Sequence, residues 1–235
     1  MKYTYLAINI LAILVPFIFS FHPKLQFHKA WKAAIPSIIA CALIFLTGDV
    51  LYTHWKVWGF NPDYLMGIYI SNLPLEEVLF FICIPYACLF TYHCLEKTSG
   101  IEAANKYEKY ITIPLILILI LSAMFFMDRL YTFAASAGLA AILIFVRFFY
   151  KAEWLGKFYL VYGILLLPFL LVNGVLTGTG LEEPIVWYDD NENLGIRILS
   201  IPFEDLFYGM ALILLNVFGF ETLKQRYNIV VPQPA

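Results

Sequence analysis

Seven predominantly apolar runs restrict this chain to very few folds. Each has the length, roughly 17–25 residues, that a helix needs to cross the hydrocarbon core of a bilayer. Only 14% of the 235 residues are charged, whereas a soluble domain has about 25%. No water inside a bilayer satisfies backbone groups, so such runs must be helical. The sequence predicts an all-α membrane protein with seven transmembrane helices, at residues 3–21, 31–52, 74–95, 110–127, 130–150, 157–176 and 202–222.

The distribution of Lys and Arg predicts how these helices are oriented. Cytoplasmic loops carry an excess of both residues. With the N-terminus outside, eleven of the fifteen basic residues fall on the inner side, and only Lys2, Lys56, Arg129 and Arg197 fall on the outer side. We therefore expect an outer N-terminus and a cytoplasmic C-terminus. The first run contains Pro16 and no small-x-small cleavage site, which favours a retained helix over a signal peptide.

An internal repeat divides the chain. Residues 67–77 read GIYISNLPLEE, and residues 195–205 read GIRILSIPFED. Upstream, the dipeptides Val57-Trp58 and Val186-Trp187 match at nearly the same offset, as do Thr47-Gly48 and Thr177-Gly178.

The repeat predicts three parts. Residues 1–97 form a first repeat with helices one to three, residues 98–128 hold a linking fourth helix, and residues 129–235 form a second repeat with helices five to seven. Helices one and five run in the same direction, so the two repeats are parallel. The third and seventh helices are then equivalent.

Each copy of the motif places two adjacent carboxyls at the start of an apolar run: Glu76 and Glu77 in one, Glu204 and Asp205 in the other. The simplest interpretation is that they face solvent and stabilise the helix N-terminus. Asn72 and Ser200 would then be N-caps, with Pro74 and Pro202 in the first turn.

The repetition of the pair and the apolar residues that follow it favour a catalytic role. A buried pair can hold one protonated and one ionised carboxyl, as a general acid and a general base require. We expect both pairs to line one shared cavity that is reachable from the lipid. Arg197 is the nearest counter-charge in sequence.

Candidate substrate-binding residues surround these acids in sequence. Aromatic rings can stabilise a cation, although an interfacial belt is an alternative role for them. Asparagines and acids within apolar runs are candidates because polar groups there face the bundle interior. The candidates are Asp49, Trp58, Asn61, Tyr64, Phe80, Trp187, Arg197, Tyr208 and Asn216.

Nothing in the sequence indicates a cofactor or a metal site. There is no GxGxxG nucleotide motif, and the four histidines have no metal-binding spacing. The four cysteines, Cys41, Cys83, Cys88 and Cys94, form no CxxC pair and are expected to be free thiols. The net charge of −2 gives no sign of a nucleic-acid partner.

Several segments together resemble a known family. Residues 57–64 (VWGFNPDY), 73–81 (LPLEEVLFF) and 85–88 (PYAC) resemble the lycopene cyclase domain of heterodimer-type carotenoid cyclases. The second half, from Arg197 through PFED at 202–205 to Asn216 and Glu221, resembles the partner subunit. The chain thus resembles a fused form with both halves in one polypeptide.

The resemblance implies lycopene β-cyclase activity, which converts lycopene through γ-carotene to β-carotene without net redox change. Glu76, Glu77, Glu204 and Asp205 would be the catalytic residues. The implied partners are lycopene and membrane lipid, with self-association or contact with other carotenoid enzymes left open. A proton-coupled transporter and a non-catalytic carotenoid-binding protein are the alternatives.

Overall fold

The computed structural model describes residues 2–96 and 101–229. These residues form two compact units. Unit 1 comprises the described residues of 1–55, 60–99 and 215–235, and unit 2 comprises those of 56–59 and 100–214. The expected boundary between residues 97 and 98 lies outside the described residues, and the three-part division of the chain stays a prediction.

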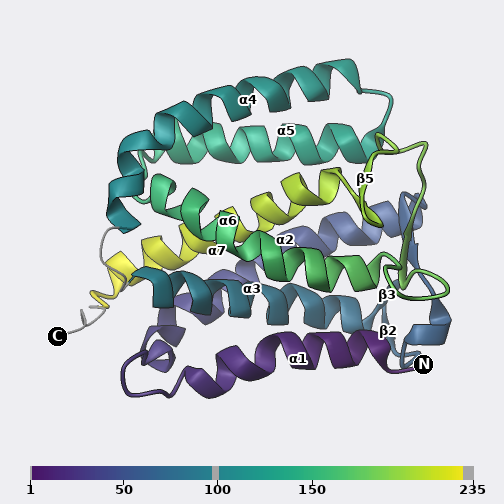
Figure 1. Ribbon diagram of the computed structural model, residues 1–235, viewed down its shortest axis with the longest axis horizontal. Helices are drawn as coiled ribbons and strands as arrows, with labels where there is room; N and C mark the ends of the chain where they lie inside the picture. Colours follow the sequence, from purple (N-terminus) through teal and green to yellow (C-terminus); the bar gives the residue numbers. More distant parts are fainter. Residues whose placement is uncertain (1, 97–100, 230–235) are drawn as a thin grey trace. The chain divides into compact units, whose positions relative to one another are not determined.

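Each of the seven apolar runs forms a helix (Figure 1). Within residues 2–96 and 101–229, six helices are long and apolar enough to cross a membrane, as expected of a multi-pass membrane protein. The first has only 16 residues, so it is about 24 Å long where the hydrocarbon core measures about 30 Å. The helices are α1 (Thr4–Phe19), α2 (Trp31–His54), α3 (Leu75–Glu96), α4 (Glu108–Phe125), α5 (Leu130–Ile144), α6 (Leu155–Leu176) and α7 (Glu204–Arg226).

Short helical segments extend or precede several of these spans. The 3₁₀ helix η1 (Phe27–Ala30) leads into α2, and η3 (Ile101–Tyr107) leads into α4. The π-helical η4 (Phe145–Phe149) continues α5, so the fifth apolar run is helical almost to its predicted end. A further 3₁₀ turn, η2 (Pro62–Tyr64), lies between α2 and α3.

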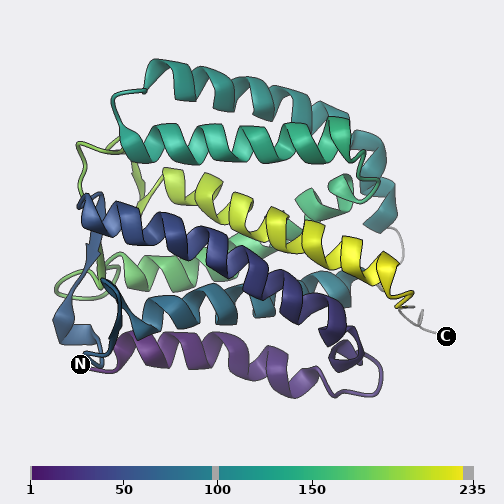
Figure 2. The same cartoon turned by 180° about the vertical axis from the view of Figure 1, so that it is seen from behind.

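In unit 1, α3 packs against both α1 and α2 (Figures 1 and 2). The C-terminal part of α7 belongs to this unit and approaches α2 closely, since a Cβ atom at Gly219 would lie 2.3 Å from Ser37 Oγ. Ser37 Oγ also donates a 2.8 Å hydrogen bond to the carbonyl of Asn216. At the end of α3, Tyr92 donates to Glu221 (2.7 Å) and Lys224 pairs with Glu96 (2.5 Å).

In unit 2, α4 packs against α5 and α6, and η3 packs against α6. Its core includes the fully buried Leu139, Leu143 and Leu155. The Tyr162 hydroxyl, on α6, donates to the Leu206 carbonyl of α7 (2.6 Å). This contact joins the two helices at the residue that directly follows the second acid pair.

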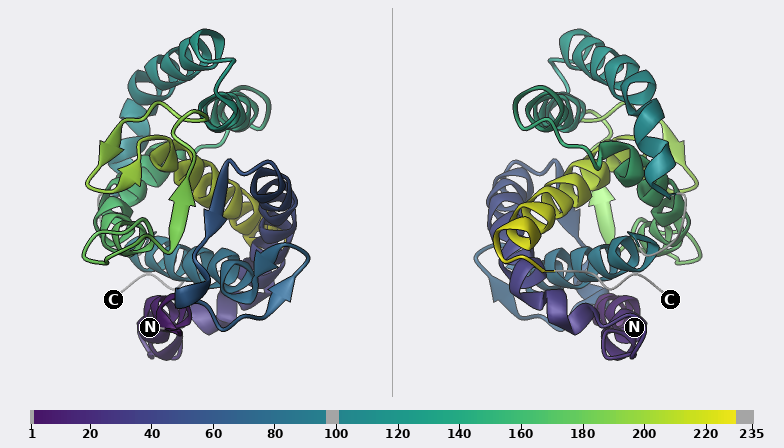
Figure 3. Two further views of the ribbon diagram at one scale, coloured as in Figure 1. Left: turned by 90° about the vertical axis from the view of Figure 1, so that its right-hand side faces the viewer. Right: turned by 90° about the vertical axis from the view of Figure 1, so that its left-hand side faces the viewer.

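Short strands gather at one end of the helices in each unit (left panel of Figure 3). The strand β2 (Tyr69–Ile70) pairs antiparallel with β3 (Leu73–Pro74), and β5 (Arg197–Ile198) pairs antiparallel with β6 (Ile201–Pro202). The strand β1 (Trp58–Phe60) pairs with β4 (Val186–Tyr188). Each repeat motif is therefore a tight hairpin that leads directly into the helix carrying the acids.

These hairpins contradict the predicted helix caps. Asn72 and Ser200 lie in the hairpin turns, and Pro74 and Pro202 end the second strands, so none of them caps or begins a helix. The backbone supplies the bonds instead. The N–H of Leu75 donates to Ile68 O (2.8 Å), and the N–H of Phe203 donates to Ile196 O (2.9 Å).

The hairpin turns predict a stabilising substitution. Leu199 has φ 57° and Ser71 has φ 60°, a left-handed conformation that costs a residue with a Cβ atom roughly 1–2 kcal/mol. The Leu199 side chain is 71% exposed, so its removal loses little packing. We expect Leu199→Gly to raise the free energy of unfolding by about 1 kcal/mol. Thermal denaturation in detergent measures the change.

Ile198→Gly is the matched control for this substitution. Ile198 lies in β5, where glycine weakens a strand. It should therefore lower the stability. A fall in stability with both variants would show that Leu199 contributes packing that outweighs its backbone strain.

Candidate active site

Both carboxylate pairs are buried. The exposed fractions are 0% for Glu76, 8% for Glu77, 0% for Glu204 and 4% for Asp205. The interpretation that these acids face solvent at a helix start is therefore wrong. Each unit holds two carboxyls together in an apolar environment, where every oxygen needs a hydrogen-bond partner or a proton.

The first acid of each pair holds the loop that precedes the hairpin. Glu76 Oε1 accepts the backbone N–H of Met66 (2.6 Å), and Glu204 Oε1 accepts that of Leu194 (2.7 Å). Glu204 Oε1 also accepts the Thr132 hydroxyl (2.6 Å). The other oxygen, Oε2, is buried in both glutamates and has no hydrogen-bond partner among the described residues.

The second acid of each pair accepts a tyrosine hydroxyl from the first helix of its repeat. Tyr5 of α1 donates to Glu77 Oε2 (2.5 Å), and Tyr131 of α5 donates to Asp205 Oδ1. Asp205 Oδ2 also accepts Asn173 Nδ2 (2.7 Å) and the Tyr188 hydroxyl (3.1 Å). Asp205 thus faces three donors, which suits an ionised carboxylate.

Asp49 occupies in unit 1 the position that Asn173 occupies in unit 2. The side chain of Asn72 donates to the carbonyl of Val50 (2.9 Å), and that of Ser200 donates to the carbonyl of Gly174 (3.0 Å). The residue before each of these carbonyls is Asp49 in one unit and Asn173 in the other. Asp49 is 1% exposed, so unit 1 buries three carboxyls where unit 2 buries two and an amide.

This correspondence corrects the upstream match made from the sequence. Thr47 lies within α2 and bonds the Leu43 carbonyl (2.7 Å), whereas Thr177 follows the last residue of α6 and bonds the Ser200 hydroxyl (2.7 Å). The similar Thr-Gly dipeptides are therefore not structurally equivalent. The hydrogen bonds from Asn72 and Ser200 instead align Asp49 of the first repeat with Asn173 of the second.

Four aromatic rings cluster in unit 2 beside Asp205. Trp58 is 6% exposed, and its ring centroid lies 5.2 Å from that of Tyr131 and 6.0 Å from those of Tyr188 and Tyr208. Tyr131 also stacks on Tyr188 at 5.8 Å. Two of these tyrosines donate to Asp205, so the carboxylate lies at the edge of an aromatic cluster.

A smaller aromatic group has the corresponding position in unit 1. The ring centroid of Tyr5 lies 6.3 Å from that of Phe80, and Phe80 lies 5.7 Å from Phe81. Phe80 is the repeat counterpart of Tyr208, since both follow the second acid by three residues. The predicted residues Phe80, Trp58 and Tyr208 therefore lie near the acids of their own units.

Arg197 does not pair with the acids as expected. Its guanidinium bonds Asp190 (2.5 Å) and the Ser200 carbonyl (2.8 Å), and it lies 6.0 Å from the Tyr188 ring. Partial burial would raise the pKa of Asp190, but the hydrogen bonds from Arg197 and Asn193 and the charge of Arg197 hold it below its usual value. Arg197 therefore stabilises the loop between β4 and β5.

The other predicted binding residues occupy different positions. The Asn61 side chain accepts the N–H of Asp63 (3.0 Å) and caps η2, and Tyr64 is buried in that turn. Trp187 is 40% exposed, and its ring covers Gly59, where a Cβ atom would lie 2.3 Å away. Asn216 is fully buried within α7, in unit 1. Substrate contact by these residues stays a prediction, as does the shared cavity, because the two pairs belong to different units.

Sequence reasoning missed Tyr5, Tyr131 and Thr132 as partners of the acids. A signal was present, because Tyr5 and Tyr131 recur 126 residues apart, close to the 128-residue offset of the motif. Each tyrosine begins an apolar run that by itself resembles an ordinary membrane span. The packing of α1 on α3 brings Tyr5 to Glu77, and the contact between α5 and α7 brings Tyr131 to Asp205. These contacts cannot be read from the apolar runs alone.

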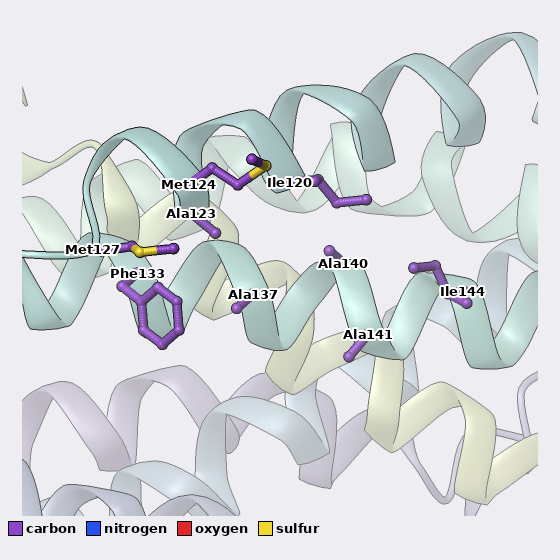
Figure 4. A pocket seen from close by; sticks show the side chains of 9 residues that line it. All are labelled: Ile120, Ala123, Met124, Met127, Phe133, Ala137, Ala140, Ala141 and Ile144. Carbon is purple, nitrogen blue, oxygen red and sulfur yellow. The ribbon is translucent and has the colours of Figure 1, made fainter.

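An apolar cavity of about 260 Å³ lies between α4 and α5 (Figure 4). None of the acids lines it, so it has no group that could donate a proton. It is lined by Ile120, Ala123, Met124, Met127, Phe133, Ala137, Ala140, Ala141 and Ile144.

The last groups to place are the cysteines and the side chains that could bind a metal ion. None of the four cysteines, all of which are described, forms a disulfide, as expected. Within residues 2–96 and 101–229, no group of three or more His, Cys, Asp or Glu side chains is arranged to hold a metal ion.

Comparison with known proteins identifies both halves of the chain. The family model described as lycopene cyclase matches residues 2–95 and 128–223. The two matched stretches contain the two acid pairs, and they lie within one polypeptide. No curated protein and no solved structure matches the chain.

The hydrogen bond from Tyr131 to Asp205 predicts the effect of a conservative substitution. Tyr131→Phe keeps the ring but leaves a buried carboxylate oxygen without its donor, which costs about 1–3 kcal/mol. We expect the free energy of unfolding to fall by that amount, measured by tryptophan fluorescence during denaturation in detergent. Tyr110→Phe is the control because that ring is 66% exposed. Equal effects of the two variants would contradict a stabilising role for the bond.

Proposed function

This chain belongs to the lycopene cyclase family, and we propose that it is a lycopene β-cyclase. In this reaction each linear end group of lycopene closes to a ring, which yields γ-carotene and then β-carotene. The single observation that carries the proposal is the pair of buried, hydrogen-bonded carboxyls at the same motif position of both matched stretches. Cyclisation by proton transfer needs a general acid and a general base away from bulk water.

For each ring that forms, the enzyme donates one proton to the substrate and removes one proton from it. A carboxylic acid donates a proton to the terminal double bond and leaves a tertiary carbocation. The electron pair of the neighbouring double bond attacks this cation and forms the ring bond, which moves the positive charge onto a ring carbon. A carboxylate then removes a ring proton, and the new ring double bond forms. No electron is gained or lost overall.

The aromatic cluster of unit 2 supports the cationic stage of this proposal. The faces of Trp58, Tyr131, Tyr188 and Tyr208 carry negative electrostatic potential that attracts a cation. Such rings stabilise a carbocation and combine with it less readily than water does. In unit 1, Phe80 and Tyr5 would have the same role on a smaller scale.

The substrate dictates the route of entry. Lycopene is about as long as the bilayer is thick and almost insoluble in water, so its end group must enter sideways from the lipid. With seven spans and the excess of basic residues on the cytoplasmic side, we place the N-terminus outside and the acid pairs at the outer ends of their helices. The acids would then receive an end group that lies near the outer membrane surface.

The proposal predicts a product change in living cells. Expression of the chain in a lycopene-accumulating bacterium should replace lycopene with γ-carotene and β-carotene, measured by chromatography and absorption spectra. Substitution of both acids of one pair by their amides, for example Glu204→Gln with Asp205→Asn, should lower the product at least tenfold because the proton donor and acceptor are lost together.

Glu192, which also lies in unit 2, provides a matched control. Glu192 accepts the backbone N–H of Leu130 (3.0 Å) at the start of α5 and belongs to neither pair, so Glu192→Gln should retain activity. Unchanged lycopene in cells that contain the intact protein in their membranes would favour a transporter or a carotenoid-binding protein. Full activity of the amide variants would refute the catalytic role of that pair.

A second experiment tests the prediction that no cofactor is needed. The purified protein in liposomes should cyclise lycopene after treatment with a metal chelator and without any added reductant, because proton transfer supplies all of the chemistry. Chromatography of the extracted carotenoids gives the yield. Activity that disappears on chelation and returns with one divalent metal would contradict the prediction, as would a strict requirement for reduced flavin.

A further inference from the structure

We propose that the two acids of each pair have different tasks: the first (Glu76 and Glu204) donates the proton, and the second (Glu77 and Asp205) accepts it. This inference rests on the proposed function and assigns the roles within it. It follows from the hydrogen bonds of each carboxyl, which differ within a pair and agree between the two units.

The first acid has an oxygen suited to carry a proton. Glu76 and Glu204 are fully buried, and each uses Oε1 to accept a backbone N–H. The Oε2 atom of each has no hydrogen-bond partner among the residues that the structure describes. A buried anion with an unsatisfied oxygen is costly, whereas a neutral carboxyl can place its hydrogen on Oε2. Among the described residues that O–H group has no acceptor, so in this proposal it donates its proton to the carbon–carbon double bond.

The second acid has surroundings suited to an anion. Asp205 accepts from Tyr131, Tyr188 and Asn173, which occupy three of the roughly four lone-pair positions of a carboxylate. One position is left to take up a ring proton. Glu77 accepts the hydroxyl of Tyr5 at 2.5 Å, the counterpart of the Tyr131 bond. Donors directed at a carboxyl stabilise its charged form.

The agreement between units argues against a chance arrangement. The residues at these positions are not the same throughout, since Asp205 replaces a glutamate, and Thr132 adds a second donor to Glu204 Oε1. Even so, Oε2 of the first acid has no hydrogen-bond partner among the described residues of either unit, and the second acid accepts a tyrosine hydroxyl in both.

The proton cycle balances. The first acid loses its proton to the terminal double bond and becomes a carboxylate, and the second carboxylate takes a proton from the new ring. The pair then holds the same number of protons as before, but on the other member. Exchange with water between turnovers then returns a proton to the first acid and removes one from the second, which restores the starting state with no net consumption of protons.

Deuterium exchange distinguishes the two tasks. The donor variant is Glu76→Gln with Glu204→Gln, and the acceptor variant is Glu77→Gln with Asp205→Asn; each is incubated with lycopene in liposomes prepared in D₂O. The acceptor variant still forms the cation, so we expect deuterium in recovered lycopene or in rings with a displaced double bond. The donor variant should leave lycopene at background deuterium content. Mass spectrometry of the extracted carotenoids measures both.

Three outcomes are separated by this design. Deuterium uptake with the donor variant, or none with the acceptor variant, would overturn the assignment of roles. Failure of the wild-type protein to form any ring would instead refute the proposed function. Thermal unfolding in detergent checks that both variants are folded.

An infrared measurement gives a second readout that needs no turnover. The carbonyl band of a protonated carboxyl should be present in the wild type and in the acceptor variant. It should weaken in the donor variant. Loss of the band in the acceptor variant alone would overturn the assignment.

Discussion

The cost of burying a carboxyl in an apolar helix bundle governs the construction of this protein. Each unit buries two adjacent acids at the start of a membrane-spanning helix, and the surrounding elements supply their partners. The loop before each hairpin offers a backbone N–H to the first acid, and the first helix of each repeat offers a tyrosine hydroxyl to the second. The hairpin brings loop and helix together, which explains why it recurs in both repeats.

The two repeats use the same framework with different chemistry. At the position where α6 presents Asn173 to Asp205, α2 presents the acid Asp49. Trp58, Tyr131, Tyr188 and Tyr208 surround the second pair with aromatic rings, whereas the first pair has Tyr5 and Phe80 nearby. A third buried carboxyl in unit 1 requires an additional proton or donor. The units are therefore related in structure and need not be equal in the reaction.

The proposed proton-driven cyclisation makes modest demands on a protein, and the buried groups of this fold are suited to each of them. It needs a proton donor held in an apolar environment, an acceptor nearby and a surface that reacts little with a carbocation. Buried carboxyls in an apolar bundle provide the first two, and aromatic faces provide the third.

The sequence by itself determined the helices, the repeat, the acids and the family, because these depend on local patterns. Apolar runs of spanning length must be helical in lipid, and the duplicated motif is visible as a string of residues. The sequence did not reveal that Asn72 and Ser200 lie in hairpin turns. It also did not reveal that Arg197 pairs with Asp190 or that Asp49 corresponds to Asn173. The tyrosine partners of Glu77 and Asp205 lie 72 and 74 residues away in sequence. Only helix packing brings such distant side chains together. The tertiary structure alone therefore decided the surroundings of each acid, and the task proposed for each acid follows from those surroundings.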